Sequence, residues 1–248
     1  MTKPHYDNIA KQYQILLQMP IFEMISYTLD HHLGDVMGKS VLDLACGEGF
    51  HTRRLKQLGA GLTVGVDVST EMISLARQAE ATEPLGIDYR VNAVQNLGLI
   101  GQFDLITAAF LLHYAPSKTE LLALCQTAAN NLKPGGRFIA MINPGRGIDQ
   151  LATTYETYGY KQEVVSPPLQ EGSNIKIMLT TAEAMTDFDI YYYTQATYEA
   201  TLKRAGFHTV TWHPMILPSH LATGQDVAYW QMFLDPAISP IAVITGQK

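Results

Sequence analysis

The sequence predicts an α/β fold, a doubly wound and mostly parallel sheet covered by helices on both faces. Two observations lead to this prediction. Strand-like apolar runs alternate with helical patterns through most of the chain, and such alternation is typical of parallel sheets. The first of these runs also leads, through a glycine-rich turn at Gly47 and Gly49, directly into a helical pattern.

The elements follow from apolar periodicity and turn residues. Residues 7–33 show helical spacing with an interruption at Pro20. Alternating elements are then expected as strand 40–45, helix 48–58, strand 62–67, a helix through Ala79 that Ser69 caps, strand 87–91, strand 103–109, helix 117–131 and strand 137–142. Pro134, Gly135 and Gly136 predict the turn before the last of these strands.

The pattern loosens after Asn143 and Pro144. Residues 145–180 are rich in glycine and proline, so we expect a helix and a long loop there, and loops of this length are commonly functional or disordered. Further elements are expected as strand 187–193, helix 195–205 ended by Gly206, strand 207–212, helix 228–234 and strand 240–245.

The bulk composition predicts a soluble protein with a substantial core. Of 248 residues, 47% are hydrophobic and 16% are charged, which can support one α/β domain with additions. The net charge of −6 argues against a nucleic acid or an anionic membrane as partner. There is no long apolar run or signal-peptide pattern, and Cys46 and Cys125 have no disulfide or metal spacing, so we expect a cytoplasmic location.

The turn within residues 41–50 contains both glycines and an acid. A pyrophosphate site would have a third glycine where this chain has Thr52, and Asp43 would repel phosphate but could accept hydrogen bonds from an ammonium group. Asp67 ends the next strand, 20 residues after Gly47, where an acid can bind the two ribose hydroxyls. The implied ligand has a ribose and an amine but no phosphate, and S-adenosylmethionine fits this description.

Four segments together resemble the class I S-adenosylmethionine-dependent methyltransferases. They are residues 41–50, 64–69, 102–109 and 132–139, and they stand in the order of that family. Residues 6–10 and 110–115 are also similar to a narrower group of bacterial small-molecule methyltransferases, such as the toxoflavin-pathway N-methyltransferases. The resemblance implies a Rossmann-like sheet of seven strands with the last antiparallel, N-terminal helices, and an insertion after the fifth strand.

The resemblance also implies how a single domain, 1–248, is organised. Residues 1–35 would form a helical cap, 36–144 the cofactor-binding core, 145–186 an active-site lid, and 187–248 the strands and helices that complete the sheet. The cofactor would be S-adenosylmethionine, with S-adenosylhomocysteine as product. The other partner would be a small-molecule acceptor, and the protein a monomer or homodimer.

The cofactor residues carried over from the family divide by the part of the ligand that they would contact. Asp43, Ala45, Gly47 and Gly49 would contact the methionine part, Asp67 the ribose, Val68 and Met72 (or Ile73) the adenine face, and Ala109 and Phe110 the methionine and sulfonium side. The family has an acid after the third strand where this chain has Asn92, whose amide oxygen can accept the adenine hydrogen bond without charge. In another register Ala93, Val94 or backbone N–H groups would make that contact.

Methyl transfer from a sulfonium needs mainly in-line alignment, with a general base only if the acceptor is protonated. His113 is the candidate base and acceptor contact, and the alternative is a loop histidine that caps the next helix. Tyr6 and Tyr13 lie in the segment that closes over the cofactor in the family, although both could be core aromatics. Tyr6 is therefore a second candidate at the reaction centre and Tyr13 a candidate acceptor contact.

The acceptor site is expected to be rich in tyrosine. Alternate residues of a strand share a face, so Tyr191 and Tyr193 are predicted to face the acceptor together with Asn143. Aromatic walls suit a heterocycle or a cationic amine. No metal site is expected, because no carboxylate cluster is present.

Three functions remain open from the sequence. The preferred one is methylation of a small metabolite at nitrogen. The alternatives are methylation at oxygen or carbon, as in a phenol or quinone precursor, and a protein that binds S-adenosylmethionine without transferring a methyl group.

Overall fold

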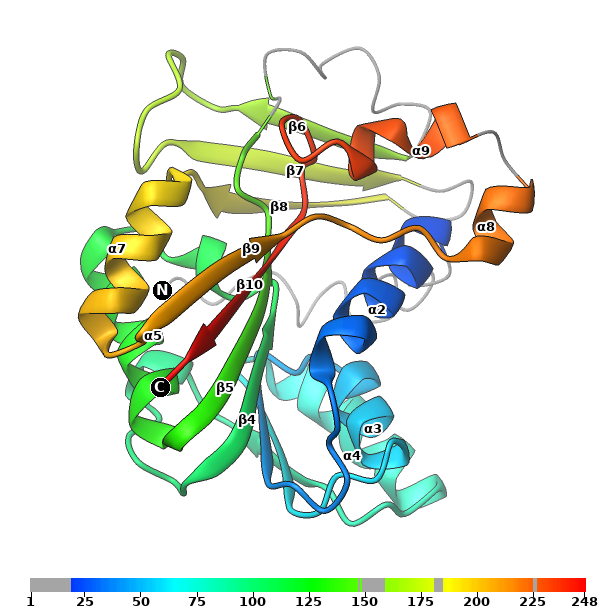
Figure 1. Cartoon of the computed structure of the whole chain (residues 1–248), viewed down its shortest axis with the longest axis vertical. Coiled ribbons are helices and arrows are strands. Elements are labelled where there is room, and N and C mark those ends of the chain that lie inside the picture. The colour runs from blue at the N-terminus through cyan, green and yellow to red at the C-terminus, as the bar shows by residue number, and fades with distance from the viewer. Residues whose placement is uncertain (1–18, 147, 149–158, 181–184, 225–226) are drawn as a thin grey trace.

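The computed structural model describes residues 19–146, 148, 159–180, 185–224 and 227–248. Its centre is a seven-stranded sheet with helices on both faces (Figure 1). The strands are β1 (Val41–Leu44), β2 (Thr63–Asp67), β3 (Asp88–Val91), β4 (Phe103–Ala109), β5 (Leu132–Ile142), β9 (Thr209–His213) and β10 (Ala242–Gln247). Their order is β3-β2-β1-β4-β5-β10-β9, and β10 is antiparallel to both of its neighbours. The predicted doubly wound fold is confirmed.

Helices cover both faces of this sheet, and the last two helices of the described chain lie near the second sheet described below (Figure 1). The helices are α2 (Pro20–Leu33), α3 (Phe50–Gln57), α4 (Thr70–Thr82), α5 (Lys118–Asn131), α7 (Gln195–Ala205), α8 (Ser219–Gly224) and α9 (Val227–Leu234), with 3₁₀ turns η1 (Val94–Asn96) and η2 (Leu112–Tyr114). The Ser69 hydroxyl accepts the Met72 N–H at 3.1 Å and caps α4, as the sequence predicted.

Two hydrophobic clusters pack against opposite faces of the central sheet. Consecutive strand residues alternate between them, as the pleat requires: Val41, Leu105 and Ile139 belong to the cluster that includes α2, whereas the residues that follow them, Leu42, Ile106 and Ala140, belong to the cluster under α5 and α7. Strands β1, β4 and β5 are therefore buried on both sides, which is typical of a parallel sheet.

A second sheet corrects the prediction for residues 145–180. Strands β6 (Tyr160–Val164), β7 (Asn174–Thr180) and β8 (Met185–Tyr191) form an antiparallel sheet in the order β6-β7-β8. A helix and long loop were expected over 145–180, and residues 187–193 were expected as a strand. The described part of the interval is largely extended, because β7 alternates buried Ile175, Ile177 and Leu179 with more exposed side chains.

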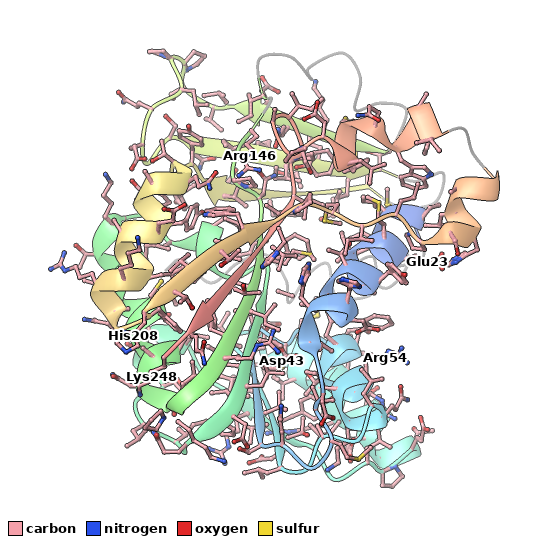
Figure 2. The ribbon with its side chains drawn as sticks, viewed as in Figure 1. Glu23, Asp43, Arg54, Arg146, His208 and Lys248 are labelled. Carbon is pink, nitrogen blue, oxygen red and sulfur yellow. The ribbon has the colours of Figure 1, made fainter. Side chains whose placement is uncertain are left out.

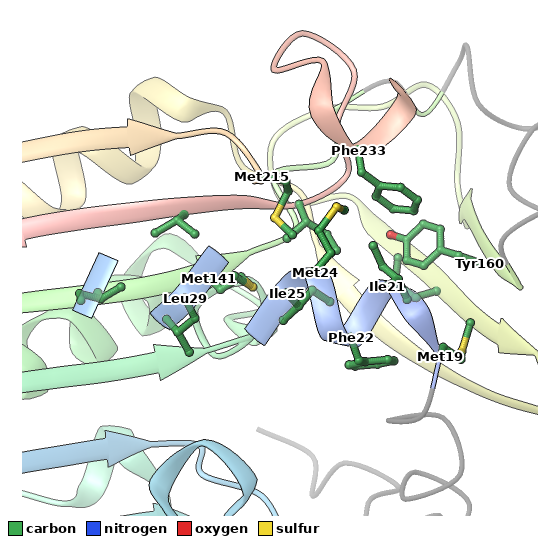
Figure 3. Close-up of a cluster of buried hydrophobic side chains, with 14 of the residues drawn as sticks. Met19, Ile21, Phe22, Met24, Ile25, Leu29, Met141, Tyr160, Met215 and Phe233 are labelled. Atoms are coloured by element: carbon green, nitrogen blue, oxygen red, sulfur yellow. The ribbon is translucent and has the colours of Figure 1, made fainter. Parts of the chain in front are cut away.

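Helix α2 joins the two sheets. Its buried side chains lie in one cluster with residues of the second sheet, and Figure 3 shows α2 with Tyr160 and Phe233 close to it. Ile21 and Ile25 of α2 share this cluster with Ile177 and Ile190. The packing holds the second sheet beside the central one, and the second of the two cavities described below is lined by residues of α2 and of the second sheet.

None of the helices in the described ranges is long and apolar enough to cross a membrane.

Candidate functional site

The site begins where the chain order of the central sheet reverses. Strands β1 and β4 are parallel neighbours there, and ligands of open α/β sheets bind beyond the carboxyl ends of such strands. Each of these two strands is followed by a non-glycine residue in the left-handed region, Ala45 and Phe110, both with φ of 59°. This conformation costs about 1–2 kcal/mol per residue and concentrates at functional sites.

The glycines of the turn after β1 serve different purposes. Gly47 has φ of 56°, and a Cβ atom built on it would meet no protein atom within 4 Å. Gly49 has φ of 88° and caps α3, and a Cβ atom there would overlap the hydroxyl of Tyr89. Gly49 is therefore required by packing, whereas Gly47 borders open space that a ligand can enter.

Asp43 is buried beside this turn. Its side chain is 1% exposed and accepts hydrogen bonds from the hydroxyls of Thr52 at 2.6 Å and Thr107 at 2.8 Å. Burial raises the pKa of Asp43 to about 6; the Asp67 carboxylate adds to this rise, and the two threonine hydrogen bonds oppose it. Figure 2 shows Asp43 in the interior of the molecule, while Arg54 lies at its edge.

Asp67 lies at the end of β2 and supports the same turn. Its carboxylate oxygens accept the N–H groups of Gly47 at 2.9 Å and of Ser69 at 2.8 Å. Its carbonyl accepts the Asn92 N–H at 2.9 Å, which ties the end of β3 to the end of β2. Asp67 thus fixes the position of the glycine turn relative to the end of β2.

The first cavity lies over the turn and has a volume of about 490 Å³. It brings together five residues that the sequence predicted for the methionine part of the cofactor: Asp43, Ala45, Gly47, Ala109 and Phe110. Phe22, Cys46, Glu48, Phe50 and His51 complete its lining.

The other predicted cofactor residues lie outside this lining but along the same sheet edge. Val68 follows β2, Asn92 and Ala93 follow β3, and Val94 is buried in η1. Met72 is buried in the first turn of α4. Their predicted contacts with ribose or adenine stay predictions.

The second cavity is apolar and has a volume of about 540 Å³. It is lined by Ile21, Phe22, Ile25, Phe110, His113, Tyr114, Asn143, Tyr160, Ile177, Leu179, Phe188, Ile190 and Ile241. Phe22 and Phe110 line both cavities, so the two meet at these rings. No acidic or basic side chain other than His113 is among the described residues of this lining.

His113 is 1% exposed and held in one orientation on η2. Its Nδ1 accepts the backbone N–H of Asn143 at 3.0 Å, and its buried Nε2 has no hydrogen-bond partner among the described residues. Burial lowers the pKa of His113 to about 3. The ring is therefore neutral, and since Nδ1 is an acceptor, the proton is on Nε2. No lone pair is left for the predicted role of general base.

Asn143 is buried at the end of β5 and belongs to a hydrogen-bond network at the second cavity. Its side-chain amide donates to the Tyr160 hydroxyl at 2.6 Å and to the Gln162 carbonyl oxygen at 3.1 Å. Its side-chain oxygen accepts the Gly145 N–H at 2.8 Å. The amide thus holds the strand end and the second sheet together. Asn143 also lines the second cavity, and its predicted contact with the acceptor stays a prediction.

The structure places the two tyrosines predicted to face the acceptor outside the lining of the second cavity. Tyr193 is buried and donates its hydroxyl to the Ala115 carbonyl at 2.9 Å, and Tyr191 packs against the cluster under α5 and α7. Neither lines the second cavity, because Phe188 and Ile190 supply that part of the wall. Tyr6 and Tyr13 lie outside the described residues.

Several residues of the lining were missed by the sequence reasoning. His51 lies in the first turn of α3 just after the glycine turn, a position that could have indicated it, and burial lowers its pKa to about 4. Phe22 and Phe188 come from α2 and β8, far from the turn in sequence. No local signal marks these two. No cluster of potential metal ligands occurs among the described residues.

The comparisons with known proteins agree with this geometry. Residues 41–136 match a family model described as a methyltransferase domain. A curated relative, the ubiquinone biosynthesis O-methyltransferase of Xanthomonas oryzae pv. oryzae, is 32% identical over 131 residues, which are 51% of this chain and 53% of the relative. The chain thus matches about half the length of such relatives.

Solved structures match over nearly the whole chain. An S-adenosylmethionine-dependent methyltransferase from Clostridium acetobutylicum aligns with a TM-score of 0.66 at 19% identity, over 96% of this chain and 98% of that one. A structure described as a DhpI–SAM–HEP complex aligns with a TM-score of 0.63 at 16% identity, over 98% and 94%. Residues 41–136 thus match a methyltransferase domain, and the described chain has the fold of solved S-adenosylmethionine-dependent methyltransferases.

Proposed function

We propose that this protein transfers a methyl group from S-adenosylmethionine to an oxygen atom of a small aromatic acceptor. The observation that carries the proposal is the meeting of two different cavities at Phe22 and Phe110. One lies at the switch point of the sheet and contains a carboxylate, and the other is apolar. A donor and an acceptor bound in these cavities would face each other across the two rings.

The residues of the first cavity fit the methionine part of the cofactor. Gly47 leaves open space where a side chain would obstruct a ligand, and Asp43 offers a carboxylate to an ammonium group. Asp67 is suited to the ribose hydroxyls, and residues 92–94 with Val68 and Met72 to the adenine. The cofactor supplies an electrophilic methyl group on sulfur.

The second cavity favours an aromatic acceptor that reacts at oxygen. Its lining contains the rings of Phe22, Phe110, Tyr114, Tyr160 and Phe188, which suit stacking on a flat molecule. No carboxylate of the described lining faces it, so a cationic amine would find no negatively charged partner among those residues. The curated relatives, over the half that aligns, are named O-methyltransferases. The sequence analysis preferred nitrogen, and these observations favour oxygen.

The chain's own contribution would be alignment and exclusion of water. Phe22 and Phe110 are fixed between the cavities, Phe110 by its N–H bond to the Met141 carbonyl at 2.7 Å. Holding two reactants in line can supply several kcal/mol of a reaction barrier, on the order of 7–11 in favourable cases. A small acceptor held by rigid walls needs no further catalytic machinery when its oxygen is already ionised.

The first experiment tests cofactor binding by calorimetry with S-adenosylhomocysteine. Asp67→Asn keeps the size of the side chain but replaces one acceptor oxygen with a donor, so affinity is expected to fall at least about tenfold, equal to about 1.4 kcal/mol. Asp88→Asn is the matched control: Asp88 lies at the opposite end of the neighbouring strand, paired with Arg90. Unchanged affinity in Asp67→Asn would overturn the ribose assignment.

The second experiment tests transfer itself. The protein is incubated with S-adenosylmethionine and a panel of catechols, other phenols and aromatic amines, and methylated products are identified by mass spectrometry. Methylated oxygen on a phenol supports the proposal, whereas products methylated only at nitrogen would restore the earlier preference. Tight cofactor binding with no product from any acceptor would identify a binding protein without transferase activity.

A further inference from the structure

We propose that His113 binds the acceptor's oxygen as a hydrogen-bond donor through Nε2–H, and that the acceptor is bound as an oxygen anion, a phenolate or enolate. This rests on the proposed function and deepens it, because it assigns a chemical class to the acceptor and a role to His113, the one histidine among the described residues of this lining.

The contact with Asn143 determines which ring nitrogen of His113 holds the proton. The Asn143 backbone N–H can only donate, so the Nδ1 atom that it contacts at 3.0 Å is the acceptor. Protonating Nδ1 would break this bond and set two N–H groups against each other. The proton of the neutral ring is therefore on Nε2, and the lone pair that a general base needs is already used.

The Asn143 backbone that contacts His113 is held rigidly. Asn143 precedes Pro144, and a residue before proline is largely confined to extended conformations. Its side chain is anchored by the Gly145 N–H at 2.8 Å and by the Tyr160 hydroxyl. The N–H that fixes the tautomer therefore cannot turn away without breaking several buried hydrogen bonds.

The Nε2–H group of His113 is available to a ligand. It is a buried donor with no partner among the described residues, on a ring that lines the second cavity. A buried donor left unsatisfied costs about 1–3 kcal/mol, so its retention at this wall is explained by a ligand that accepts from it. The other titratable side chains of the described lining are Tyr114 and Tyr160, and both are donors that an oxygen anion tolerates.

An anionic acceptor removes the need for a base. The acceptor releases its proton to solvent before it binds, and the oxygen lone pair then takes the methyl group while the electron pair of the broken C–S bond stays on sulfur. No proton moves in that step, so a histidine locked as a donor can take part in it. A hydrogen bond to a charged oxygen contributes about 1.5–3 kcal/mol, roughly 10- to 150-fold in affinity.

The test uses the full-length protein with S-adenosylhomocysteine, and 4-nitrophenol as probe because it ionises near neutral pH and its anion absorbs visible light. Nitrobenzene, which lacks the phenolic oxygen, is the matched control ligand. His113→Gln keeps an N–H donor near the Nε2 position but cannot act as a base, and His113→Leu removes the donor. Long-range ¹⁵N–¹H NMR of the imidazole reports the tautomer directly.

The expected result is a protonated Nε2 and an unprotonated Nδ1 in the wild type at neutral pH. His113→Leu should weaken binding of 4-nitrophenolate at least about tenfold and change nitrobenzene binding little, and His113→Gln should retain most of the phenolate affinity. A structural role alone would affect both ligands equally. The proposal is overturned by a protonated Nδ1, by failure of 4-nitrophenolate to bind, or by an equal loss in His113→Gln and His113→Leu.

Turnover with a phenol from the acceptor panel separates the two proposals. Product formation together with a failed probe result removes the role of His113 and leaves the transferase function. A donor tautomer and selective phenolate binding without methylated product remove the transferase function and leave an oxygen-anion site.

Discussion

Replacement of Asp43 by asparagine should stabilise the protein in the absence of cofactor. The Asp43 carboxylate is buried, and its neighbours are the uncharged hydroxyls of Thr52 and Thr107. Asparagine has nearly the same shape, and its amide can accept from one threonine hydroxyl and donate to the other. The variant would therefore keep the packing and the hydrogen bonds but remove a buried charge.

The magnitude follows from the pKa of Asp43, which burial raises from 3.8 to about 6. A rise of about two pKa units corresponds to about 3 kcal/mol. Between these two pKa values the folded state holds more protons than the unfolded state, so the charge costs stability progressively as pH rises. Below pH 3.8 the Asp43 charge should cost the wild type no stability relative to the variant. Above pH 6 the difference in free energy of unfolding between the two proteins should level off.

The assay is thermal and urea unfolding of both proteins at pH 8 and pH 5. At pH 8 the variant should be more stable by about 3 kcal/mol, a rise of roughly 6–12 °C in Tm for a chain of this size. At pH 5 the advantage should fall to about half. Affinity for S-adenosylhomocysteine should fall at least about tenfold, because the ammonium group loses its charged partner.

Asp104→Asn is the control of opposite sign. Hydrogen bonds from Lys133 and Ser40 hold the pKa of Asp104 well below its usual value, so this variant should be less stable than the wild type at pH 8. The reasoning on Asp43 is refuted if Asp43→Asn is no more stable than the wild type at pH 8, or if its advantage is the same at both pH values.

Two further predictions concern the turn and the helix that follows β2. Gly49→Ala should destabilise the fold by roughly 2–4 kcal/mol, because the added methyl group overlaps Tyr89 and the residue has a positive φ. Gly47→Ala should destabilise the fold by only about 1–2 kcal/mol, through backbone strain. Its main effect should be weaker cofactor binding. Urea unfolding and calorimetry of the pair check this, and equal stability losses would contradict it. Ser69→Ala should lower the free energy of unfolding by about 1 kcal/mol through loss of the α4 cap, measured by urea titration; no change would show that the cap is dispensable.

Much of the central fold could be predicted from the sequence because its signals are local. The predicted strands 62–67 and 103–109 nearly coincide with β2 and β4, and the Ser69 cap is present. The second sheet was missed because glycine and proline around residues 145–180 suggested a loop. The alternation of Ile175, Ile177 and Leu179 was the signal for a strand, and its apolar side is buried against α2 and α9, which a strand-by-strand reading does not reveal.

The site residues also divide into those that local sequence signals predicted and those that they did not. Five residues of the first cavity were predicted, since they lie at the ends of β1 and β4 in recognisable turns. The lining of the second cavity was not predicted as well: Tyr191 and Tyr193 were chosen for their ring type, but the register of β8 directs Phe188 and Ile190 to this cavity. A shift of one residue along a strand reverses which face a side chain takes.

The sequence by itself determined the strand-to-helix turn, the acids Asp43 and Asp67 and hence the kind of cofactor, because these features depend on backbone geometry within one βαβ unit. Only the tertiary structure decided the second cavity. Its walls come mainly from α2, η2 and the second sheet, and the proton on His113 Nε2 depends on a backbone N–H 30 residues away. Contacts between such distant segments leave no periodic trace in the sequence, so the first cavity could be inferred from residues in order and the second cavity could not.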